Sequence, residues 1–245
     1  PSAVLSCLDS EQAKIRLFAM NIAAETGLKE SAPALIKLAE AADDPDDLID
    51  VLTAMSKIRS PEFLPLFKAH LEHPDPLVAA ISLEMMGAYQ EHGALETLVE
   101  VIRRNEEDDR FAICEITTWS ALGALGQLGS EDSLAALASL IHHKNPTARR
   151  GVHEVLIEAG SRALPHLDAI LTSGASGEKI MALYLLGMIG DRKGGSHIIS
   201  ALDKGLLDQA NMKFAAYEAL GQMPSMQSLV SLVDGLEHEQ DPLAL

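Results

Sequence analysis

Hydrophobic positions along the chain come in blocks about one helix long, separated by short polar breaks. Residues 180–189 are apolar on nearly every side and carry no charge. A helix of that kind must be buried on several sides. Sustained alternation with a period of two is absent, and the abundant Leu and Ala favour helix over strand. The pattern therefore predicts an all-α protein.

The blocks repeat. Each apolar helix ends in a turn, and a second, Leu-rich helix follows after a short polar segment. We expect these turns at Gly27, Arg59, Gly93, Gly129, Gly160, Gly190 and Met223. Two helices of about 12 residues with two short loops need about this spacing. We therefore expect a single repeat domain over 1–245, with helix pairs at roughly 10–43, 44–73, 74–104, 105–143, 144–172, 173–204 and 205–237.

Helix starts carry their own signals. Asp44-Pro45, Asp75-Pro76 and Asn145-Pro146 each precede a first helix. A side-chain oxygen at the N-cap and proline at the first helical position are both preferred there. Glycine suits the left-handed residue that ends many helices.

A degenerate motif recurs in the first helices: a basic residue, an Ala-rich stretch, and Leu-Gly near the end. The basic residues are Arg16, Arg149, Lys179 and Lys213. The pattern resembles the HEAT repeat family, and in particular its bacterial HEAT-like branch of the phycobilisome-lyase type, over almost the whole chain. The resemblance implies a right-handed α-α superhelix, an α-solenoid of about seven helix pairs whose second helices line a concave groove. The basic column is expected to pair with acids or carbonyls of neighbouring units.

Composition narrows the choice of function. The chain has 36 acidic residues against 19 Lys and Arg, a formal charge of −17, which argues against binding nucleic acid. No apolar run is long enough to span a membrane, and no signal peptide is visible. Cys7 and Cys114 form neither a disulfide framework nor a metal motif, which favours a reducing, cytoplasmic setting.

The sequence favours a non-catalytic scaffold or regulatory module, which binds a protein or peptide in the concave groove. We expect no catalytic residue, metal or cofactor. Extended repeat grooves suit peptide or helix recognition. The candidate contacts, which we call the groove set, are the polar residues of the second helices: Lys37, Glu40, Lys68, Glu72, Glu100, Arg103, His142, His166, His197 and Asp234.

A second candidate surface is an acidic edge at the connections between units. It comprises Asp43, Asp44, Asp46, Asp47, Glu106, Glu107, Asp108 and Asp109. Helix capping and solubility explain such residues. An acidic edge that steers a basic partner is the functional alternative.

Two enzymatic alternatives and a structural one stay open. In deoxyhypusine hydroxylase, His-Glu pairs across several HEAT repeats hold a di-iron centre, whereas this chain has the single pair His153-Glu154. His142, His143, His166 and His197 could form a metal or pH-sensing cluster if they align on one face. Bilin-lyase relatives share the short repeat, which is an analogy of fold alone. The chain could also be a spacer within a larger protein, and residues 241–245 echo residues 75–79, which favours a fragment.

Overall fold

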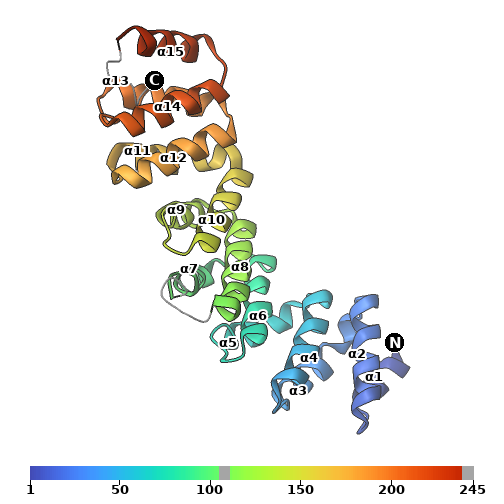
Figure 1. Ribbon diagram of the computed structural model, residues 1–245. Helices are drawn as coiled ribbons and strands as arrows, with labels where there is room; N and C mark the ends of the chain where they lie inside the picture. The colour runs from blue at the N-terminus through green and yellow to red at the C-terminus, as the bar shows by residue number, and fades with distance from the viewer. Residues whose placement is uncertain (105–110, 239–245) are drawn as a thin grey trace. The chain divides into compact units, whose positions relative to one another are not determined.

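The computed structural model describes residues 1–104 and 111–238. These residues form helices and connecting turns, and none of them lies in a strand (Figure 1). The chain divides into two compact units, Pro1–Leu128 and Gly129–Leu245. The all-α expectation is confirmed. The seven predicted unit boundaries stay a prediction, and the break between the compact units falls within the predicted pair 105–143.

The first unit has two layers of helices. The first helices pack side by side in the order α2, α4, α6 and α8, and the second helices α3, α5 and α7 cover them. A short 3-10 turn leads into each of these second helices. The helices are α1 (Ser2–Leu8), α2 (Ala13–Thr26), α3 (Ala32–Glu40), α4 (Pro45–Ile58), α5 (Leu64–Ala69), α6 (Pro76–Ala88), α7 (Leu95–Arg104) and α8 (Phe111–Leu128).

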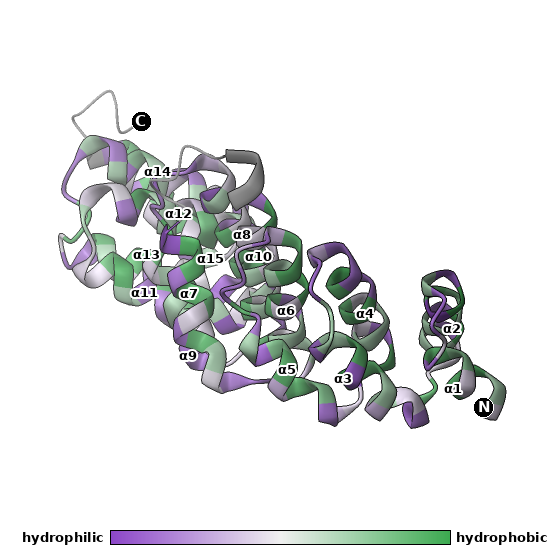
Figure 2. Ribbon diagram, turned by 90° about the horizontal axis from the view of Figure 1, so that it is seen from below, coloured by the Kyte–Doolittle hydropathy of each residue, from purple (hydrophilic) through white to green (hydrophobic). Residues whose placement is uncertain are grey.

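The second unit repeats this arrangement. Its first helices pack in the order α10, α12 and α14, and its second helices in the order α9, α11, α13 and α15. Figure 2 shows hydrophobic residues mainly along the helices and hydrophilic residues mainly at helix ends and in connections. The helices are α9 (Glu131–Ser139), α10 (Pro146–Ala159), α11 (Leu164–Ser173), α12 (Ser176–Ile189), α13 (Arg192–Asp203), α14 (Ala210–Gln222) and α15 (Met226–His238).

Glycines let neighbouring first helices approach closely. A Cβ added to Gly87 of α6 would lie 2.7 Å from the Cα of Ala124 on α8. A Cβ added to Gly187 of α12 would lie 3.2 Å from the Cα of Ala219 on α14. Glycine is therefore required at position 87, whereas at Gly187, in the Leu-Gly ending of the repeat motif, a side chain would meet a tight contact with the adjacent repeat.

The predicted helix starts are confirmed. The Asp44 carboxylate accepts from the backbone N–H of Asp46, and the Asp75 carboxylate accepts from those of Leu77 and Val78. The amide oxygen of Asn145 likewise accepts from Thr147 and Ala148. Each cap satisfies backbone donors that the first helical turn leaves without partners.

The predicted helix ends are confirmed in part. Gly27, Arg59 and Gly190 follow their helices in the left-handed conformation. The turn expected at Gly93 is wrong, because α6 already ends at Ala88 and the residue with positive φ is Gln90, at 55°. The Gln90 side chain stabilises this left-handed turn, because its Nε2 donates to the carbonyls of Gly87 at 3.0 Å and Gln127 at 2.8 Å.

Carbonyl contacts account for three of the four basic residues of the motif: Arg16, Arg149 and Lys179. Arg16 Nη1 donates to the Ser10 carbonyl at 3.0 Å, and Arg149 Nη1 to the His143 carbonyl at 2.8 Å. Lys179 reaches the Leu206 carbonyl, also at 2.8 Å, in the connection before α14. The arginines therefore bind the loop before their own helix, and the lysine binds a neighbouring repeat. Among the described residues, no helix is long and apolar enough to cross a membrane.

Candidate functional site

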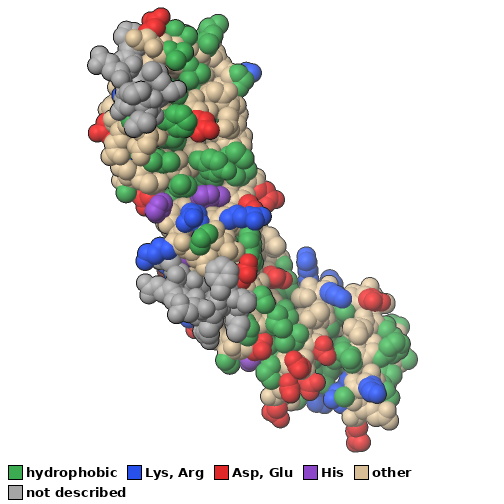
Figure 3. Space-filling model, in the orientation of Figure 1, with side chains coloured by type: hydrophobic (Ala, Val, Ile, Leu, Met, Phe, Trp, Pro, Cys, Tyr) green, Lys and Arg blue, Asp and Glu red, His purple; other side chains and the backbone are tan. Residues whose placement is uncertain are grey.

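A surface hollow of about 480 Å³ lies between α10 and α12 in the second unit. Its lining residues come from both helices: Pro146, Arg149, Arg150, His153, Glu154, Ile157, Tyr184 and Met188. On the face seen in Figure 3, basic and histidine side chains gather over α10, and hydrophobic side chains gather over α12. We call this site the α10–α12 hollow.

Two adjacent arginines supply its positive charge. Arg149 is fixed by its contact with the His143 carbonyl. Arg150 is exposed, and its Nε donates to Glu154 Oε1 at 2.7 Å, one turn further along α10. An exposed pair of this kind contributes little to stability, so Arg150 can exchange Glu154 for another carboxylate at small cost.

The His153 side chain is half-buried and lines one side of the hollow. Its Nε2 lies 2.9 Å from the Ile141 carbonyl, which can only accept, so Nε2 carries the proton and donates. Burial lowers the pKa of His153, and the nearby charge of Arg149 lowers it further, against the opposing effect of the carbonyl contact. The imidazole is therefore neutral at neutral pH, with Nδ1 as an acceptor.

An apolar wall faces these polar groups. Tyr184 and Met188 of α12 are 50% and 47% exposed, and Ile157 of α10 completes the wall. The Tyr184 and His153 rings lie with their centroids 6.3 Å apart. The hollow thus offers two guanidinium groups beside aromatic and thioether surface, which suits a planar apolar ligand that carries carboxylates.

The groove set of the first unit is largely engaged in ion pairs. Arg104, which the sequence analysis did not select, donates to Glu72 at 2.7 Å and to Glu100 at 3.2 Å. Lys68 lies 3.5 Å from Glu91, and Lys37 lies 4.0 Å from Asp9. Glu40 and Arg103 are exposed. The structure brings Glu72 and Glu100 together through Arg104.

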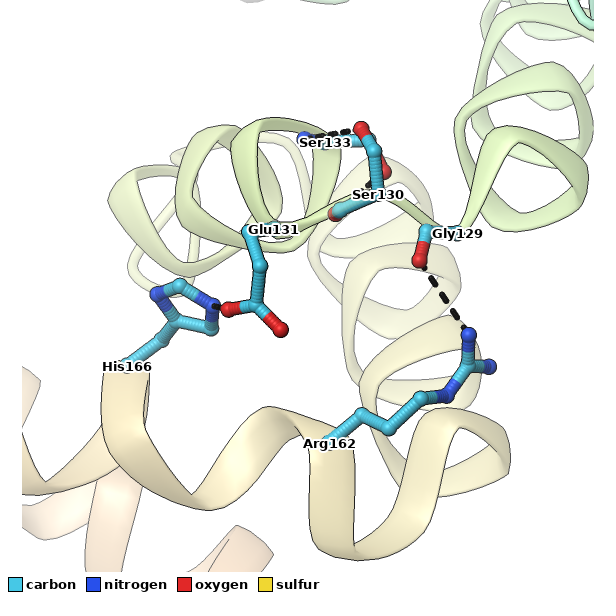
Figure 4. A network of polar contacts seen from close by, with 6 residues as sticks. All are labelled: Gly129, Ser130, Glu131, Ser133, Arg162 and His166. Atoms are coloured by element: carbon cyan, nitrogen blue, oxygen red, sulfur yellow. Dashed lines mark hydrogen bonds and ion pairs between the residues drawn. The ribbon is translucent and has the colours of Figure 1, made fainter.

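Two histidines of the groove set, His166 and His197, contact carboxylates of preceding second helices. His166 Nε2 lies 3.1 Å from Glu131 Oε2, and His197 Nδ1 lies 3.0 Å from Asp168 Oδ1. In Figure 4, Glu131 points from α9 towards His166 of α11, while Arg162 reaches the Gly129 carbonyl at 3.1 Å. These contacts tie successive repeats of the unit together, whether or not the groove also binds a partner.

The other members of the histidine and groove hypotheses lie apart from this network. His142 is exposed beside Gly177, at the start of α12. His143 is buried, and its Nδ1 accepts from the Asn145 backbone N–H at 3.2 Å, which is a structural role. Asp234 is exposed on α15. Among the described residues, no group of three or more His, Cys, Asp and Glu side chains could hold a metal ion.

Half of the acidic edge can be placed. Asp43, Asp44, Asp46 and Asp47 are exposed at the start of α4, where Asp44 is the cap. Residues 106–109, the other half, lie outside the described residues. A partner at the edge stays a prediction.

The first unit has a hollow of its own, of about 400 Å³, between α1, α2, α3 and α4. Its floor is apolar and includes Leu8, Met20 and Val51. Lys37 of the groove set and Asp47 of the acidic edge both lie on its rim. Acidic and basic residues line this hollow in equal number, whereas two arginines and one acid, Glu154, line the α10–α12 hollow.

Sequence reasoning did not select most of the α10–α12 hollow. The pairs Arg149-Arg150 and His153-Glu154 were visible on one predicted helix, but Tyr184 belongs to a run that reads as core. The available signal for the site was the presence of two aromatic side chains, His153 and Tyr184, on the first helices of consecutive helix pairs. No local pattern indicated that Tyr184 and Met188 would be exposed towards α10.

The layered helix pairs define an all-α fold of the HEAT-like helical-repeat class. A solved structure with this fold is the complex of CpcE and CpcF of phycocyanin lyase from Nostoc sp. PCC7120. The identity is 22%, the TM-score is 0.51, and the match covers 96% of this chain and 94% of that chain. Human deoxyhypusine hydroxylase in complex with glycerol is 18% identical with a TM-score of 0.36, over 91% of this chain and 83% of that chain. No family model and no curated protein matches the chain.

These comparisons correct one expectation. The prediction that the chain is not an enzyme is contradicted, because the fold occurs in a phycocyanin lyase complex. That prediction took the lack of a catalytic motif in a repeat protein as a sign of a scaffold. In a repeat fold a few side chains from separate helices can form a site without leaving a motif.

Proposed function

We propose that the chain is a subunit of a bilin-lyase-type enzyme and acts together with a second HEAT-like protein. The observation that carries the proposal is the likeness in fold to the phycocyanin lyase complex, over 96% of this chain and 94% of that chain. The second protein belongs to the proposal because that solved structure contains two proteins.

The chemistry of the α10–α12 hollow supports a bilin as the ligand. A bilin is an open-chain tetrapyrrole, a conjugated apolar molecule with two propionate carboxylates and a row of ring N–H groups. Arg149 and Arg150 would receive a propionate, because guanidinium groups bind carboxylates with two parallel hydrogen bonds. Tyr184 and Met188 would cover the face of a pyrrole ring. The neutral Nδ1 of His153 would accept from a ring N–H.

The hollow is open, so it would hold one end of the pigment and leave the other end to a partner protein. Arg150 must leave Glu154 when a propionate arrives, and the exposed ion pair costs little to break. Arg149 stays on the His143 carbonyl through Nη1, and its remaining N–H groups can face the ligand.

The test is a titration of the purified chain with phycocyanobilin, followed by visible absorption and by induced circular dichroism. We expect saturable binding with an induced dichroic band. Arg150→Ala should raise the dissociation constant about tenfold, the loss expected when one charge-assisted contact is removed. Tyr184→Ala should raise it by a similar factor.

The matched control is Arg192→Ala, which removes an equally charged, exposed side chain from α13. It should leave binding unchanged. If Arg150→Ala and Arg192→Ala weaken bilin binding equally, the interaction is non-specific charge attraction. No saturable spectral change in the unaltered chain, alone or with bilin-free phycocyanin present, would refute the proposal.

A further inference from the structure

The hollow of the first unit, between α1, α2, α3 and α4, combines an apolar floor with charges of both signs. We call it the α1–α4 hollow. Its volume of about 400 Å³ lies within the range of small-ligand pockets, about 300–1,000 Å³. Leu8, Met20 and Val51 are buried in its floor. The charged residues that line it are Asp9, Lys14, Arg16, Lys37, Asp47 and Asp50.

The two walls of this hollow carry opposite charge. Lys37 of α3 lies 4.0 Å from Asp9 at the end of α1, so these two residues neutralise each other. The other four charged residues divide by helix, because both residues on α2 are basic and both residues on α4 are acidic. These residues are Lys14 and Arg16 on α2, and Asp47 and Asp50 on α4.

These four charged groups are available to a ligand. Lys14, Asp47 and Asp50 are exposed, and their side chains form no hydrogen bond or ion pair with another described residue. Arg16 is half-buried, and its Nη1 donates to two carbonyls of the connection before α2, each at 3.0 Å. Its Nε and Nη2 make no hydrogen bond to a described residue. The opposite charges of the two walls therefore line one hollow without pairing across it.

The charge distribution selects the class of ligand. A purely anionic molecule would be repelled by the acids of α4, on a chain with a formal charge of −17, and a purely cationic one by the basic residues of α2. A molecule with an anionic and a cationic end fits both walls. The two ends must be well separated, because the walls do not pair directly. An extended dipeptide, which spans about 7 Å, provides this separation.

We propose that the α1–α4 hollow binds a short apolar peptide with free, charged ends. The peptide carboxylate accepts from Lys14 and from the remaining N–H groups of Arg16. The peptide ammonium donates to Asp47 and Asp50, and the apolar side chains lie on the floor of the hollow. Two such ends fix the direction of the peptide. This site lies in the first unit and does not rest on the function proposed for the α10–α12 hollow.

The experiment titrates the full chain, labelled with nitrogen-15, with leucyl-leucine and with leucyl-alanyl-leucine, and follows the backbone amide signals by NMR. We expect saturable shifts of the signals from the residues that line the hollow on α2 and α4. Each peptide is also used with its carboxylate blocked as an amide, with its amine blocked by acetylation, and with both ends blocked. Blocking either end should raise the dissociation constant about three- to tenfold, as for the loss of exposed charge pairs.

Two variants assign the ends of the peptide to the walls. Lys14→Gln should weaken binding of the free peptide about threefold and leave binding of the amide-blocked peptide unchanged. Asp50→Asn should likewise weaken binding of the free peptide and leave that of the acetylated peptide unchanged. The matched controls are Lys29→Gln and Glu25→Gln, which change exposed residues near the other end of α2 and should have no effect. Circular dichroism of each variant checks that the helices are retained.

Four results would overturn the proposal. The first is the absence of saturable shifts at the hollow with either peptide. The second is equal binding of the peptide with both ends blocked, which would make the hollow a purely apolar site. The third is tighter binding of the amide-blocked peptide, which would identify a cation as the ligand. The fourth is a loss from Lys14→Gln and Asp50→Asn no greater than that from the controls, which would leave only non-specific attraction.

Discussion

The two compact units use the same layered arrangement but achieve close helix packing to different degrees. In the first unit, the backbones of α6 and α8 meet at Gly87, where a Cβ would lie 2.7 Å from the Ala124 Cα. In the second unit, the corresponding distance from Gly187 to the Ala219 Cα is 3.2 Å. The position in the repeat is the same, but only the first contact excludes any side chain.

The polar links between successive turns differ in chemistry as well. In the first unit, the Tyr89 hydroxyl donates to the Ser60 carbonyl at 2.7 Å, and burial raises the pKa of Tyr89 to about 12. In the second unit, Arg162 reaches the Gly129 carbonyl, and the Ser161 hydroxyl donates to Asp191. In both units, side chains join equivalent turns of successive repeats. The residue types that make these contacts differ between the units.

The largest effect should come from filling the glycine contacts. Gly87→Ala must push α6 and α8 apart, and we expect a loss of about 2–4 kcal/mol in the free energy of unfolding. Gly187→Ala should cost about 1 kcal/mol or less, because a small shift relieves its contact and alanine favours helix. Urea denaturation followed by circular dichroism measures both.

Gly123→Ala is the control for this pair. A Cβ there would meet nothing within 4 Å, so the substitution should stabilise α8 by up to about 1 kcal/mol. Equal losses in the free energy of unfolding from Gly87→Ala and Gly187→Ala would contradict the prediction that the contact between α6 and α8 is the tighter of the two.

A smaller effect is expected from the equivalent arginines. Arg16→Ala and Arg149→Ala each remove a charge-assisted hydrogen bond to a carbonyl six residues earlier. Each should cost about 1–2 kcal/mol. Arg192→Ala on α13 should stay within about 0.5 kcal/mol of the unaltered chain. Losses from Arg16→Ala and Arg149→Ala no larger than that of Arg192→Ala would mean that the carbonyl contacts do not hold the loops.

The smallest effect concerns pH. Met20 and His153 occupy equivalent positions, four residues after Arg16 in the first unit and four residues after Arg149 in the second. Met20 is a buried apolar residue, whereas His153 can be charged. Because the folded-state pKa of His153 is lowered, its contribution is complete above its unfolded value of about 6.5 and is lost as pH falls through the lower folded value.

His153→Met should make the second unit resemble the first. We expect a loss of up to about 1 kcal/mol at pH 8, from the missing bond to the Ile141 carbonyl, and a shallower fall in stability below pH 6.5. Thermal unfolding across the acid range measures the slope. A slope unchanged by the substitution would assign the acid sensitivity to other groups.

Local chemistry made the helix pairs and their starts predictable. Asp44, Asp75 and Asn145 predict the starts of first helices, because a capping side chain accepts from backbone N–H groups within three residues of itself. The turn at Gln90 was missed because the rule for left-handed residues looks for glycine, while the compensating contact with Gln127 comes from another helix. A sequence pattern does not contain such a partner.

The candidate site was predictable only in fragments for the same reason. Arg149, Arg150 and His153 lie on one helix, but Tyr184 and Met188 join them through packing of α12 beside α10. The repeat pattern and the lack of a catalytic motif indicated a scaffold, and the likeness in fold to a lyase complex corrected the prediction that the chain is not an enzyme.

The arginine contacts have a consequence for how such a chain can grow. Arg16 and Ser10, like Arg149 and His143, lie only six residues apart in the sequence, so each contact is complete within one helix pair and the loop that precedes it. A duplicated gene segment that encodes a helix pair together with this preceding loop would carry both partners of the contact to the new location. The contact from Lys179 to Leu206 joins two repeats, so a copied segment would have to find a suitable neighbour again.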